Sequence, residues 1–493
     1  MSGRAGDVFL SEETWTNRIF LGGAWVPGSG GSLDVVEPAT GSTLGQVGLA
    51  TADDLAKAAE SAADAQREWA ATPHPQRAAV LRTAAQLWSK HGEEIQWWNV
   101  REVGAIPPMA GFALHVAEQE CYEAASLPSR PYGQLLASEE PRLSMARRVP
   151  AGVVGVISPF NVPIILGIRS VAPALALGNS VILKPDPRTA VTGGVVLARV
   201  FEEAGLPPGV LQMLPGGADV GEAMVTHPLV RVISFTGSTA AGRKVGELAG
   251  RHLKRVHLEL GGNSALIILD DADVDEAANL AAFGSFFHQG QICMTTGRHL
   301  VHERLYDDFV ERLAAKAAHL PVGDPARQQV ALGPLIDAGQ RDKVHRLVTA
   351  SVDTGARIAA GGAFDELFYS ATVLADVPPR APAVTEEIFG PVAPVLRFSD
   401  VEEAVRLATA SEYGLSLGIV TRDPLKGLAL ADRIPTGIVH INDQTVADEA
   451  NSPFGGVAAS GTGSRFGGAE ANIDAFTETR WVTMRGQPPT YPF

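Results

Sequence analysis

The chain has 493 residues, which is too long for a single hydrophobic core, so two or three domains are expected. Hydrophobic residues make up 45% and charged residues 19%, the composition of an ordinary globular enzyme rather than of a disordered or fibrous protein. The net charge of −15 argues against nucleic acid or an anionic membrane as the main partner, since both attract an excess of Lys and Arg.

The start of the chain has no apolar core before a cleavage-like site, so no signal peptide is expected. The most apolar run, residues 162–168, ends at Arg169 and is far shorter than the roughly 18 residues of a membrane span. The two cysteines, Cys121 and Cys293, cannot form a disulfide framework. A reduced, cytoplasmic setting is therefore expected.

Helices are predicted next. Residues 51–71 read as a helix with Thr51 as a capping residue, and residues 78–100 continue helically. Cys121 lies in another helix-like stretch, where a thiol packs as a small hydrophobe. Residues 127–148 break this rhythm with Pro, Gly and mixed charge, which is typical of a linker or of an arm that pairs with another subunit.

From Val153 the chain contains short β-branched runs that end in Gly, Pro or Ser: "VVGVIS", "SVILKP", "RVISFTG", "RVHLELGG" and "ALIIL". Helical stretches such as residues 193–205 separate several of them, and a second series runs from Ser264 to residues 437–443. This alternation predicts an α/β architecture with parallel sheets. Ligands of such sheets bind beyond the carboxyl ends of the strands.

Two polar residues stand at such strand ends. Asn161, between two prolines, could donate a hydrogen bond to a developing oxyanion, although a turn asparagine is the usual role in this setting. Glu259 could take a proton from a thiol or from water, although a lone Glu at a strand end more often faces solvent. Neither residue is decisive alone.

A phosphate site is also indicated. Lys184 leaves one strand, and Gly237 and Ser238 open a helix whose N–H groups suit a pyrophosphate. The usual GxGxxG fingerprint is absent, and Lys184 by itself could be a surface lysine.

Cys293 lies in "GQICMTTGR" among small and polar residues rather than among bulky apolar ones. A thiolate is a strong nucleophile, but a lone cysteine is more often structural than catalytic, so the case for catalysis depends on the residues that accompany it.

In this order and spacing, the motifs resemble the aldehyde dehydrogenase superfamily. The resemblance runs from residues 36–47 to residues 453–467 and 475–480, and it includes "LELGGNS", "GQICMTTGR" and "EEIFGPV". It implies a Rossmann-like NAD(P)-binding domain, an α/β catalytic domain and a small oligomerisation arm in a homodimer or homotetramer. The implied bounds are 1–126 and 149–258 for the first domain, 259–470 for the second, and 127–148 and 471–493 for the arm.

The resemblance also assigns roles. Cys293 matches the nucleophile, Glu259 the general base, and Asn161 the oxyanion donor beside the Cys293 N–H. The implied cofactor is NAD or NADP, with no metal ion. Its expected contacts are Lys184 at the adenosine ribose, Gly237 and Ser238 near the phosphates, and Glu387 and Phe389 around the nicotinamide.

The implied reaction has two halves. The Cys293 thiolate attacks the aldehyde and hydride leaves for the nicotinamide, and Glu259 then activates water to hydrolyse the thioester. Family members that pass the acyl group to coenzyme A typically lack this Glu, so hydrolysis is expected. The branch that acts on glyceraldehyde phosphates is less expected, because the sequence shows no additional phosphate-binding cluster near Cys293.

One position departs from many relatives. They carry Glu three residues after the lysine, where this chain has Pro187 followed by Arg188. Loss of that carboxylate removes a barrier to NADP, and Lys184 and Arg188 could both face a 2′-phosphate. We therefore expect NAD as cofactor with NADP tolerated.

Three further segments resemble the benzaldehyde dehydrogenase group, with vanillin and salicylaldehyde dehydrogenases as near neighbours: "LKPDPRTAVTGG", "VHINDQTVADE" and "FTETRWVTMR". A broad-specificity aliphatic enzyme is the alternative. By this resemblance the aldehyde tunnel is lined by Val162, Leu166, Arg169, Ile292, Met294, Thr445 and Phe454. The set is mostly apolar and suits a flat aromatic ring. Arg169 either faces a polar or anionic substituent or, as the favoured interpretation, forms an ion pair that faces away.

Two other classes of protein were weighed. A cofactor-independent cysteine hydrolase would pair Cys293 with a histidine, but none of the 12 histidines stands in a recognisable signature. A non-catalytic binding member of the fold would have no chemical need for Cys293, Glu259 and Asn161 together.

Overall fold

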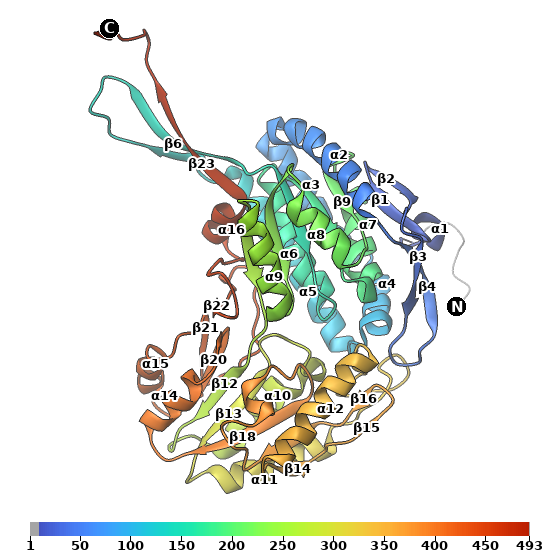
Figure 1. Cartoon of the computed structure of the whole chain (residues 1–493), viewed down its shortest axis with the longest axis vertical. Helices are drawn as coiled ribbons and strands as arrows, with labels where there is room; N and C mark the ends of the chain where they lie inside the picture. Colours follow the sequence, from blue (N-terminus) through green and yellow to red (C-terminus); the bar gives the residue numbers. More distant parts are fainter. Residues whose placement is uncertain (1–8, 493) are drawn as a thin grey trace.

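The computed structural model describes residues 9–492. Two seven-stranded sheets with helices packed on them form the two halves of the molecule, and a three-stranded antiparallel sheet projects from one end (Figure 1). None of the helices within residues 9–492 is long and apolar enough to cross a membrane.

The first sheet has the order β11-β10-β7-β8-β9-β1-β2. Its first five strands run parallel, and β1 and β2 extend the edge antiparallel. The strands are β1 (Arg18–Leu21), β2 (Ala24–Pro27), β7 (Val153–Ile157), β8 (Ser180–Lys184), β9 (Leu211–Met213), β10 (Val230–Thr236) and β11 (Arg255–Glu259). The central strand β8 is buried along its whole length, as expected for a parallel strand covered on both faces.

Helices cover this sheet: α2 (Ala52–Ala71), α3 (His74–Lys90), α5 (Pro107–Ser126), α6 (Pro163–Ala176), α7 (Val196–Glu203), α8 (Ala218–Thr226) and α9 (Thr239–Arg251). The predicted cap of α2 is confirmed, since the Thr51 side chain accepts a hydrogen bond from Asp54 N–H and Asp54 returns one in a capping box. The stretch predicted as helical over 78–100 is divided: α3 ends at Lys90, and α4 (Gly92–Trp98) runs into a π-helical turn (Asn99–Val103).

The second sheet has the order β14-β17-β18-β13-β12-β20-β21 and is parallel except at β14. Its strands are β12 (Ser264–Ile268), β13 (Thr296–His302), β14 (Arg357–Ala360), β17 (Thr372–Ala375), β18 (Val392–Phe398), β20 (Ser416–Val420) and β21 (Ile438–Ile441). The longer helices of this half are α10 (Val274–Phe286), α11 (Tyr306–His319), α12 (Ala338–Asp353), α14 (Val401–Thr409) and α15 (Pro424–Ala431). This half therefore repeats the βα alternation of the first.

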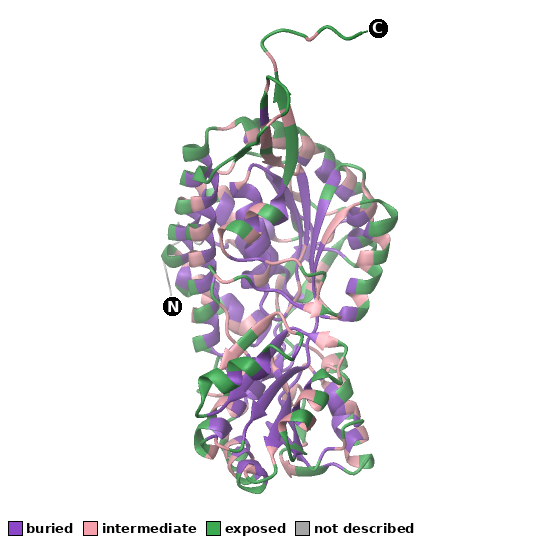
Figure 2. Cartoon of the chain, turned by 90° about the vertical axis from the view of Figure 1, so that its left-hand side faces the viewer, coloured by how far each residue is buried: buried purple, intermediate pink, exposed green. Residues whose placement is uncertain are grey.

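The projecting sheet consists of β5 (Gly133–Leu135), β6 (Leu143–Pro150) and β23 (Thr477–Met484), paired antiparallel. Residues 127–148 thus contain strands rather than a structureless linker. Figure 2 shows that most of this arm is exposed. Just before β23, helix α16 (Ala469–Phe476) returns to the first half, and Phe466 and Phe476 pack in the core of the first sheet.

The remaining short strands form three two-stranded pairs: β3 (Ser32–Val36) with β4 (Thr43–Gly48), β15 (Phe364–Asp365) with β16 (Phe368–Tyr369), and β19 (Tyr413–Gly414) with β22 (Val457–Ala458). The short helices are α1 (Glu12–Trp15) and α13 (Pro382–Thr385).

Candidate active site

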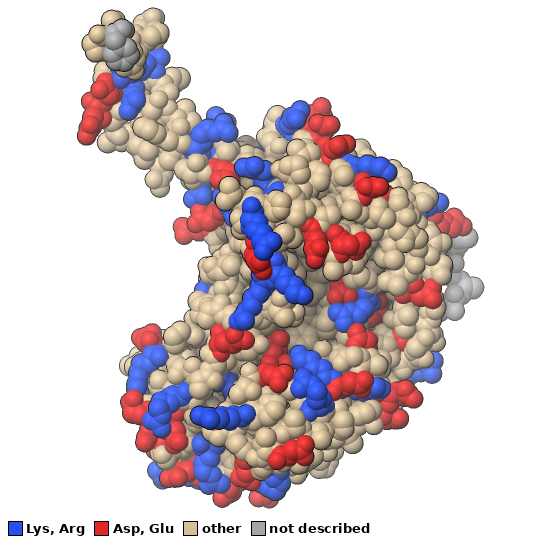
Figure 3. Space-filling view, viewed as in Figure 1, with Lys and Arg blue, Asp and Glu red and all other residues tan. Residues whose placement is uncertain are grey.

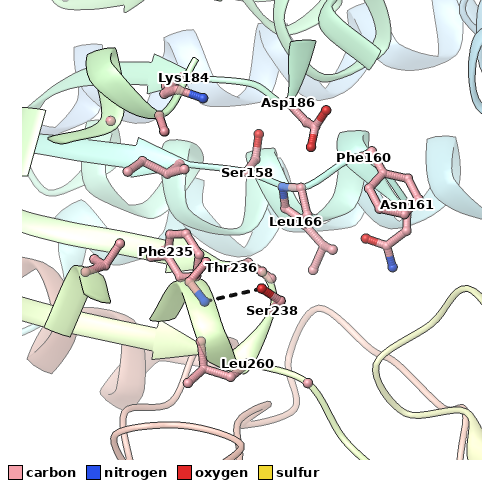
Figure 4. Close-up of a pocket in the computed structure, with 18 of the residues that line it drawn as sticks. Ser158, Phe160, Asn161, Leu166, Lys184, Asp186, Phe235, Thr236, Ser238 and Leu260 are labelled. Carbon is pink, nitrogen blue, oxygen red and sulfur yellow. Dashed lines mark hydrogen bonds between the residues drawn. The ribbon is translucent and has the colours of Figure 1, made fainter. Parts of the chain in front are cut away.

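The carboxyl ends of four parallel strands place polar residues along one edge of the first sheet. The strand registers pair Ile157 with Lys184 and Thr236 with Glu259, so β7 ends level with β8 and β10 level with β11. Figure 4 shows Lys184, Ser158 and Thr236 at or just beyond these ends. This edge is where an open α/β sheet binds its ligands.

A cavity of about 490 Å³ lies at this edge. Residues of both halves line it, and Figure 3 shows the hollow between the halves with acidic and basic side chains interspersed on this face. Eight of the residues singled out from the sequence line the cavity: Asn161, Leu166, Lys184, Gly237, Ser238, Cys293, Glu387 and Phe389. The fold therefore brings the predicted thiol and amide together with all of the predicted cofactor-contacting residues.

Cys293 lies in the turn between a short 3-10 segment (Phe287–Gly290) and β13. Burial raises the pKa of its thiol to about 12, and the nearby charges of Glu387 and Glu259 act in the same direction. The thiol is therefore neutral near pH 7, and a base must take its proton before it can attack as a thiolate.

The two glycines of "LELGGNS" allow the site to close around Cys293. A Cβ on Gly262 would lie 2.4 Å from the Cys293 carbonyl oxygen, and one on Gly261 would lie 2.4 Å from Glu387 Oε2. A larger residue at position 262 would require the cysteine turn to move, whereas one at position 261 would displace the Glu387 side chain. These glycines therefore permit the close approach of β11, the cysteine turn and Glu387.

Glu259 ends β11 and is 4% exposed. Neither of its carboxylate oxygens has a hydrogen-bond partner of good geometry among the described residues. Burial raises its pKa well above the usual value, although the positive charges of Arg465 and Arg169 oppose this shift. A buried carboxylate with a raised pKa beside a thiol is suited to act as a general base.

Asn161 is held from two sides by the segment that precedes the cysteine. Its side-chain Nδ2 donates to the Gln291 carbonyl at 2.7 Å, and its own carbonyl accepts from His288 Nε2 at 2.7 Å. His288 and Gln289 have left-handed backbones, with φ of 51° and 56°, which non-glycine residues rarely adopt. Burial lowers the pKa of His288 to about 4, so the ring that supports Asn161 is neutral near pH 7.

Sequence reasoning missed His288, because no histidine stood in a known signature. It lies two residues before the cysteine motif, and that position is the only signal that pointed to it. The structure places its ring against Asn161 rather than pairing it with Cys293 as a base.

The residues expected to contact a dinucleotide surround the same cavity. Ser238 caps α9, its hydroxyl accepting from Ala241 N–H at 3.3 Å, so this helix begins at the cavity wall. Glu387 Oε1 accepts from Gly262 N–H at 2.9 Å, and the Phe389 ring packs edge-to-face on Phe160 with 5.9 Å between ring centroids. A charged group, a helix N-terminus and aromatic rings in one cavity fit a dinucleotide.

Arg188 does not stand free at this site, contrary to the expectation that it could face a 2′-phosphate. Its Nε and Nη2 donate to Asp186 at 2.9 and 2.8 Å, and its Nη1 donates to Asp337 at 2.7 Å. Its guanidinium carbon also lies 4.1 Å from the centroid of the Phe160 ring. Asp186 and Arg188 both line the cavity, where they stand as an ion pair.

The residues expected to line the aldehyde tunnel fall into two buried apolar groups. Ile292, Met294 and Phe454 pack together beside Cys293, and Val162 packs in a second group with Leu166 at its edge. Phe287 contacts both groups. Thr445 is fully buried and its hydroxyl donates to the Met294 carbonyl at 2.7 Å, so it supports this wall from behind.

Arg169, the remaining tunnel residue, is 3% exposed and forms ion pairs with Glu120 and Asp448. Sequence reasoning identified neither carboxylate partner. The favoured interpretation of an ion pair is confirmed, but the guanidinium does not face away from the site, since its Cζ lies 4.8 Å from the centroid of Phe454.

A neutral thiol, a fixed amide and the residues expected to contact a dinucleotide share this cavity, and Glu259 lies within electrostatic reach of the thiol. This combination fits an oxidoreductase with a cysteine in its site. Comparison with known proteins gives the family. The aldehyde dehydrogenase family profile matches residues 25–482. The chain belongs to the aldehyde dehydrogenase family, whose members use NAD or NADP, and it has the aldehyde dehydrogenase fold.

Three relatives are informative. A vanillin dehydrogenase of an Amycolatopsis species is 70% identical over 98% of this chain and 100% of its own length. The benzaldehyde dehydrogenase [NAD(+)] of Pseudomonas putida is 50% identical over 97% of this chain and 98% of its own. The crystal structure of a salicylaldehyde dehydrogenase from Pseudomonas putida G7 complexed with salicylaldehyde matches with a TM-score of 0.93 and 36% identity, over 97% of this chain and 100% of that one.

Proposed function

We propose that this enzyme oxidises an aromatic aldehyde to the carboxylic acid through a thioester on Cys293. The observation that carries the proposal is the buried Glu259 carboxylate, with its raised pKa, within electrostatic reach of the Cys293 thiol, which shares its cavity with Asn161. The apolar wall of Ile292, Met294 and Phe454 supports an aromatic substrate, as do the names of the relatives. Benzaldehyde and vanillin are the two candidate substrates.

Each catalytic residue then has one task. Glu259 takes the thiol proton, directly or through water, and the sulfur of Cys293 adds to the aldehyde carbon. Asn161 Nδ2 and the Cys293 N–H stabilise the oxyanion. The Gln291 carbonyl holds the amide, and His288 holds the main chain of Asn161. Bound NAD(P) supplies the hydride acceptor. Glu259 passes the thiol proton to solvent and then deprotonates the water that cleaves the thioester. The water proton goes to the departing Cys293 sulfur, so the acid is released and the thiol is restored.

The residues that would hold NAD(P) are those expected from the sequence. Lys184 would contact the adenosine ribose, Gly237 and Ser238 the phosphates, and Glu387 and Phe389 the nicotinamide ribose and ring. Their common position around the cavity supports this assignment. NAD is proposed as the preferred cofactor, with NADP accepted.

A panel of aldehydes tests the substrate class. We expect kcat/KM for benzaldehyde or vanillin to exceed that for straight-chain aliphatic aldehydes by at least about tenfold, which corresponds to roughly 1.4 kcal/mol. Formation of NADH, followed by absorbance, is the measurement. Equal or faster oxidation of aliphatic aldehydes would favour the broad-specificity alternative. Absence of NADH formation with every aldehyde would favour the cofactor-independent cysteine hydrolase.

The raised pKa of Glu259 predicts the pH dependence. The base must be ionised, so kcat should fall when the pH drops below the raised pKa of Glu259, which lies well above 4.5. The expected fall is about tenfold per pH unit. The Cys293 thiol, with its pKa at about 12, contributes no second fall near neutrality. A profile of kcat from mildly acidic to alkaline pH checks this, and a flat acidic limb would contradict it.

Cofactor choice should depend on Asp186, which stands beside Lys184 and holds Arg188. Asp186→Asn removes this negative charge and loosens Arg188, so the kcat/KM ratio of NADP to NAD should rise by about tenfold. Asp337→Asn is the matched control, because it removes the other ion pair of Arg188 but leaves the carboxylate beside Lys184. An unchanged ratio in Asp186→Asn would refute this account.

We also propose that residues 1–126 and 149–258 act as the NAD(P)-binding domain, residues 259–470 as the catalytic domain, and residues 127–148 and 471–493 as the subunit-pairing arm. The arm exposes large apolar side chains, among them Leu135, Trp481 and Met484. Exposed apolar surface of this kind favours a homodimer or homotetramer, which sedimentation measurements would detect. A cytoplasmic location is proposed from the two unpaired cysteines.

A further inference from the structure

A buried cluster of one arginine and two carboxylates lies next to the proposed aldehyde site. Arg169, on α6, donates from Nε to Glu120 Oε1 at 3.1 Å and from Nη2 to Asp448 Oδ1 at 2.5 Å. The side chains of Arg169 and Glu120 are 4% and 1% exposed. These pairs hold the guanidinium in a fixed orientation, because two of its three nitrogens, Nε and Nη2, are bound to carboxylates.

The third nitrogen of the Arg169 guanidinium, Nη1, is buried and has no hydrogen-bond partner among the described residues. An unpaired donor in a buried setting is unfavourable, and nearly all such groups in folded proteins find an acceptor. An acceptor that arrives with a ligand would satisfy it.

The position of the guanidinium indicates which ligand this would be. Its Cζ lies 4.8 Å from the centroid of the Phe454 ring. Phe454 packs with Ile292 and Met294, the two residues that flank Cys293 in the sequence. The charge of Arg169 also lowers the pKa of the Cys293 thiol, so the two groups are within electrostatic reach of each other. The guanidinium that carries the free donor therefore lies against Phe454, a member of the apolar wall proposed for the aromatic ring.

The charge of the cluster limits the chemistry of the acceptor. With both carboxylates ionised, the cluster of Arg169, Glu120 and Asp448 has a net charge of −1. Burial raises the pKa of Glu120 to about 7, so the cluster ranges from −1 to neutral near pH 7 and is not a net cation. Such a cluster offers a hydrogen-bond donor but repels a carboxylate. A hydroxyl or ether oxygen is the fitting acceptor.

We propose that Arg169 Nη1 donates a hydrogen bond to an oxygen substituent on the ring of the aldehyde, so that Arg169 selects hydroxylated or methoxylated benzaldehydes. This inference rests on the proposed function and deepens it. An aldehyde without that oxygen leaves the donor unpaired in the bound complex, and sites built to pair with a substrate oxygen discriminate strongly against analogues that lack it.

The test compares isosteric substrates. For each ring position, kcat/KM is measured for the hydroxybenzaldehyde and for the matching methylbenzaldehyde, in the wild type and in Arg169→Lys. Lysine keeps a positive charge between Glu120 and Asp448 but lacks the Nη1 donor. We expect the hydroxyl-to-methyl ratio to fall by about tenfold or more at one ring position at least. The ratio cancels differences in the amount of folded enzyme.

Arg77→Lys is the matched control. Arg77 is also a buried arginine, 4% exposed, but it donates to backbone carbonyls, including that of Ala176, and to the Tyr132 hydroxyl rather than to the carboxylates that hold Arg169. Its substitution should lower stability and leave the hydroxyl-to-methyl ratio unchanged. A ratio that is unchanged in Arg169→Lys at all ring positions overturns the inference, as does an equal fall in Arg77→Lys.

A measurement on the wild type alone covers the case in which Arg169→Lys does not fold. Benzyl alcohols are inhibitors without an aldehyde group, and one hydroxybenzyl alcohol should inhibit more tightly than the methylbenzyl alcohol with the same ring position. Weaker inhibition by every hydroxyl isomer overturns the inference. If the wild type oxidises none of the benzaldehydes, the proposed function fails and the inference fails with it. Efficient oxidation of methylbenzaldehydes with no effect of Arg169→Lys overturns the inference alone.

Discussion

Cys293→Ala is expected to lower aldehyde oxidation by at least about 10⁴-fold, because the sulfur forms the covalent bond to substrate and no other group can replace it. Alanine differs from cysteine only by the missing sulfur, so the substitution should leave the fold and the cofactor cavity intact. The measurement is NADH formation at high enzyme concentration, together with cofactor binding by fluorescence and the far-ultraviolet circular dichroism spectrum.

Cys121→Ala is the matched control. Cys121 is fully buried in α5, away from the cavity, and burial raises the pKa of its thiol beyond the range in which it reacts. Its loss should leave kcat nearly unchanged. Substantial oxidation by the Cys293→Ala protein, or equal losses in the two variants, would rule out Cys293 as the nucleophile.

Glu259→Gln is expected to lower steady-state turnover by about 100-fold or more, since general base catalysis commonly contributes this much. Both half-reactions should slow, since Glu259 takes a proton from the thiol in the first and from water in the second. Hydrolysis of the thioester should slow more, because water is a weaker acid and a weaker nucleophile than the thiol and depends more on the base. Stopped-flow absorbance should then show a burst of NADH close to one equivalent per site, followed by slow turnover. A linear trace without a burst at unchanged turnover would contradict the assignment.

The same substitution should raise thermal stability. The pKa of Glu259 is raised on folding, so its ionised form opposes folding at pH values above the unfolded pKa, and a neutral glutamine removes that penalty. Glu102→Gln is the control: Glu102 is also fully buried with its pKa raised to about 7, but it accepts hydrogen bonds from the N–H groups of Val191 and Thr192. Its loss should destabilise the fold and leave the burst kinetics unchanged. If Glu259→Gln lowers the melting temperature as much as Glu102→Gln does, Glu259 is structural.

The sequence by itself determined the local framework of this protein. The Thr51 cap of α2 and the Ser238 cap of α9 depend on hydrogen bonds to the backbone three residues on, so they follow from residue order alone. The strand ends at Lys184 and Glu259 were equally predictable, because β-branched runs stop at glycine and proline. The resemblance to the aldehyde dehydrogenase family rests on such local motifs and was confirmed over residues 25–482.

The tertiary structure alone decided which groups satisfy the charges. Arg188 pairs with Asp337, 149 residues away, and Arg169 pairs with Glu120 and Asp448, 49 and 279 residues away. Sequence reasoning left Arg188 free for a phosphate and could not name the partners of Arg169. Local sequence patterns indicate which residues are neighbours on one helix or strand. Residues this far apart in the sequence come into contact only when whole elements pack together. A buried charge is costly unless it is paired, and the packing of the fold decides which residue pairs with it.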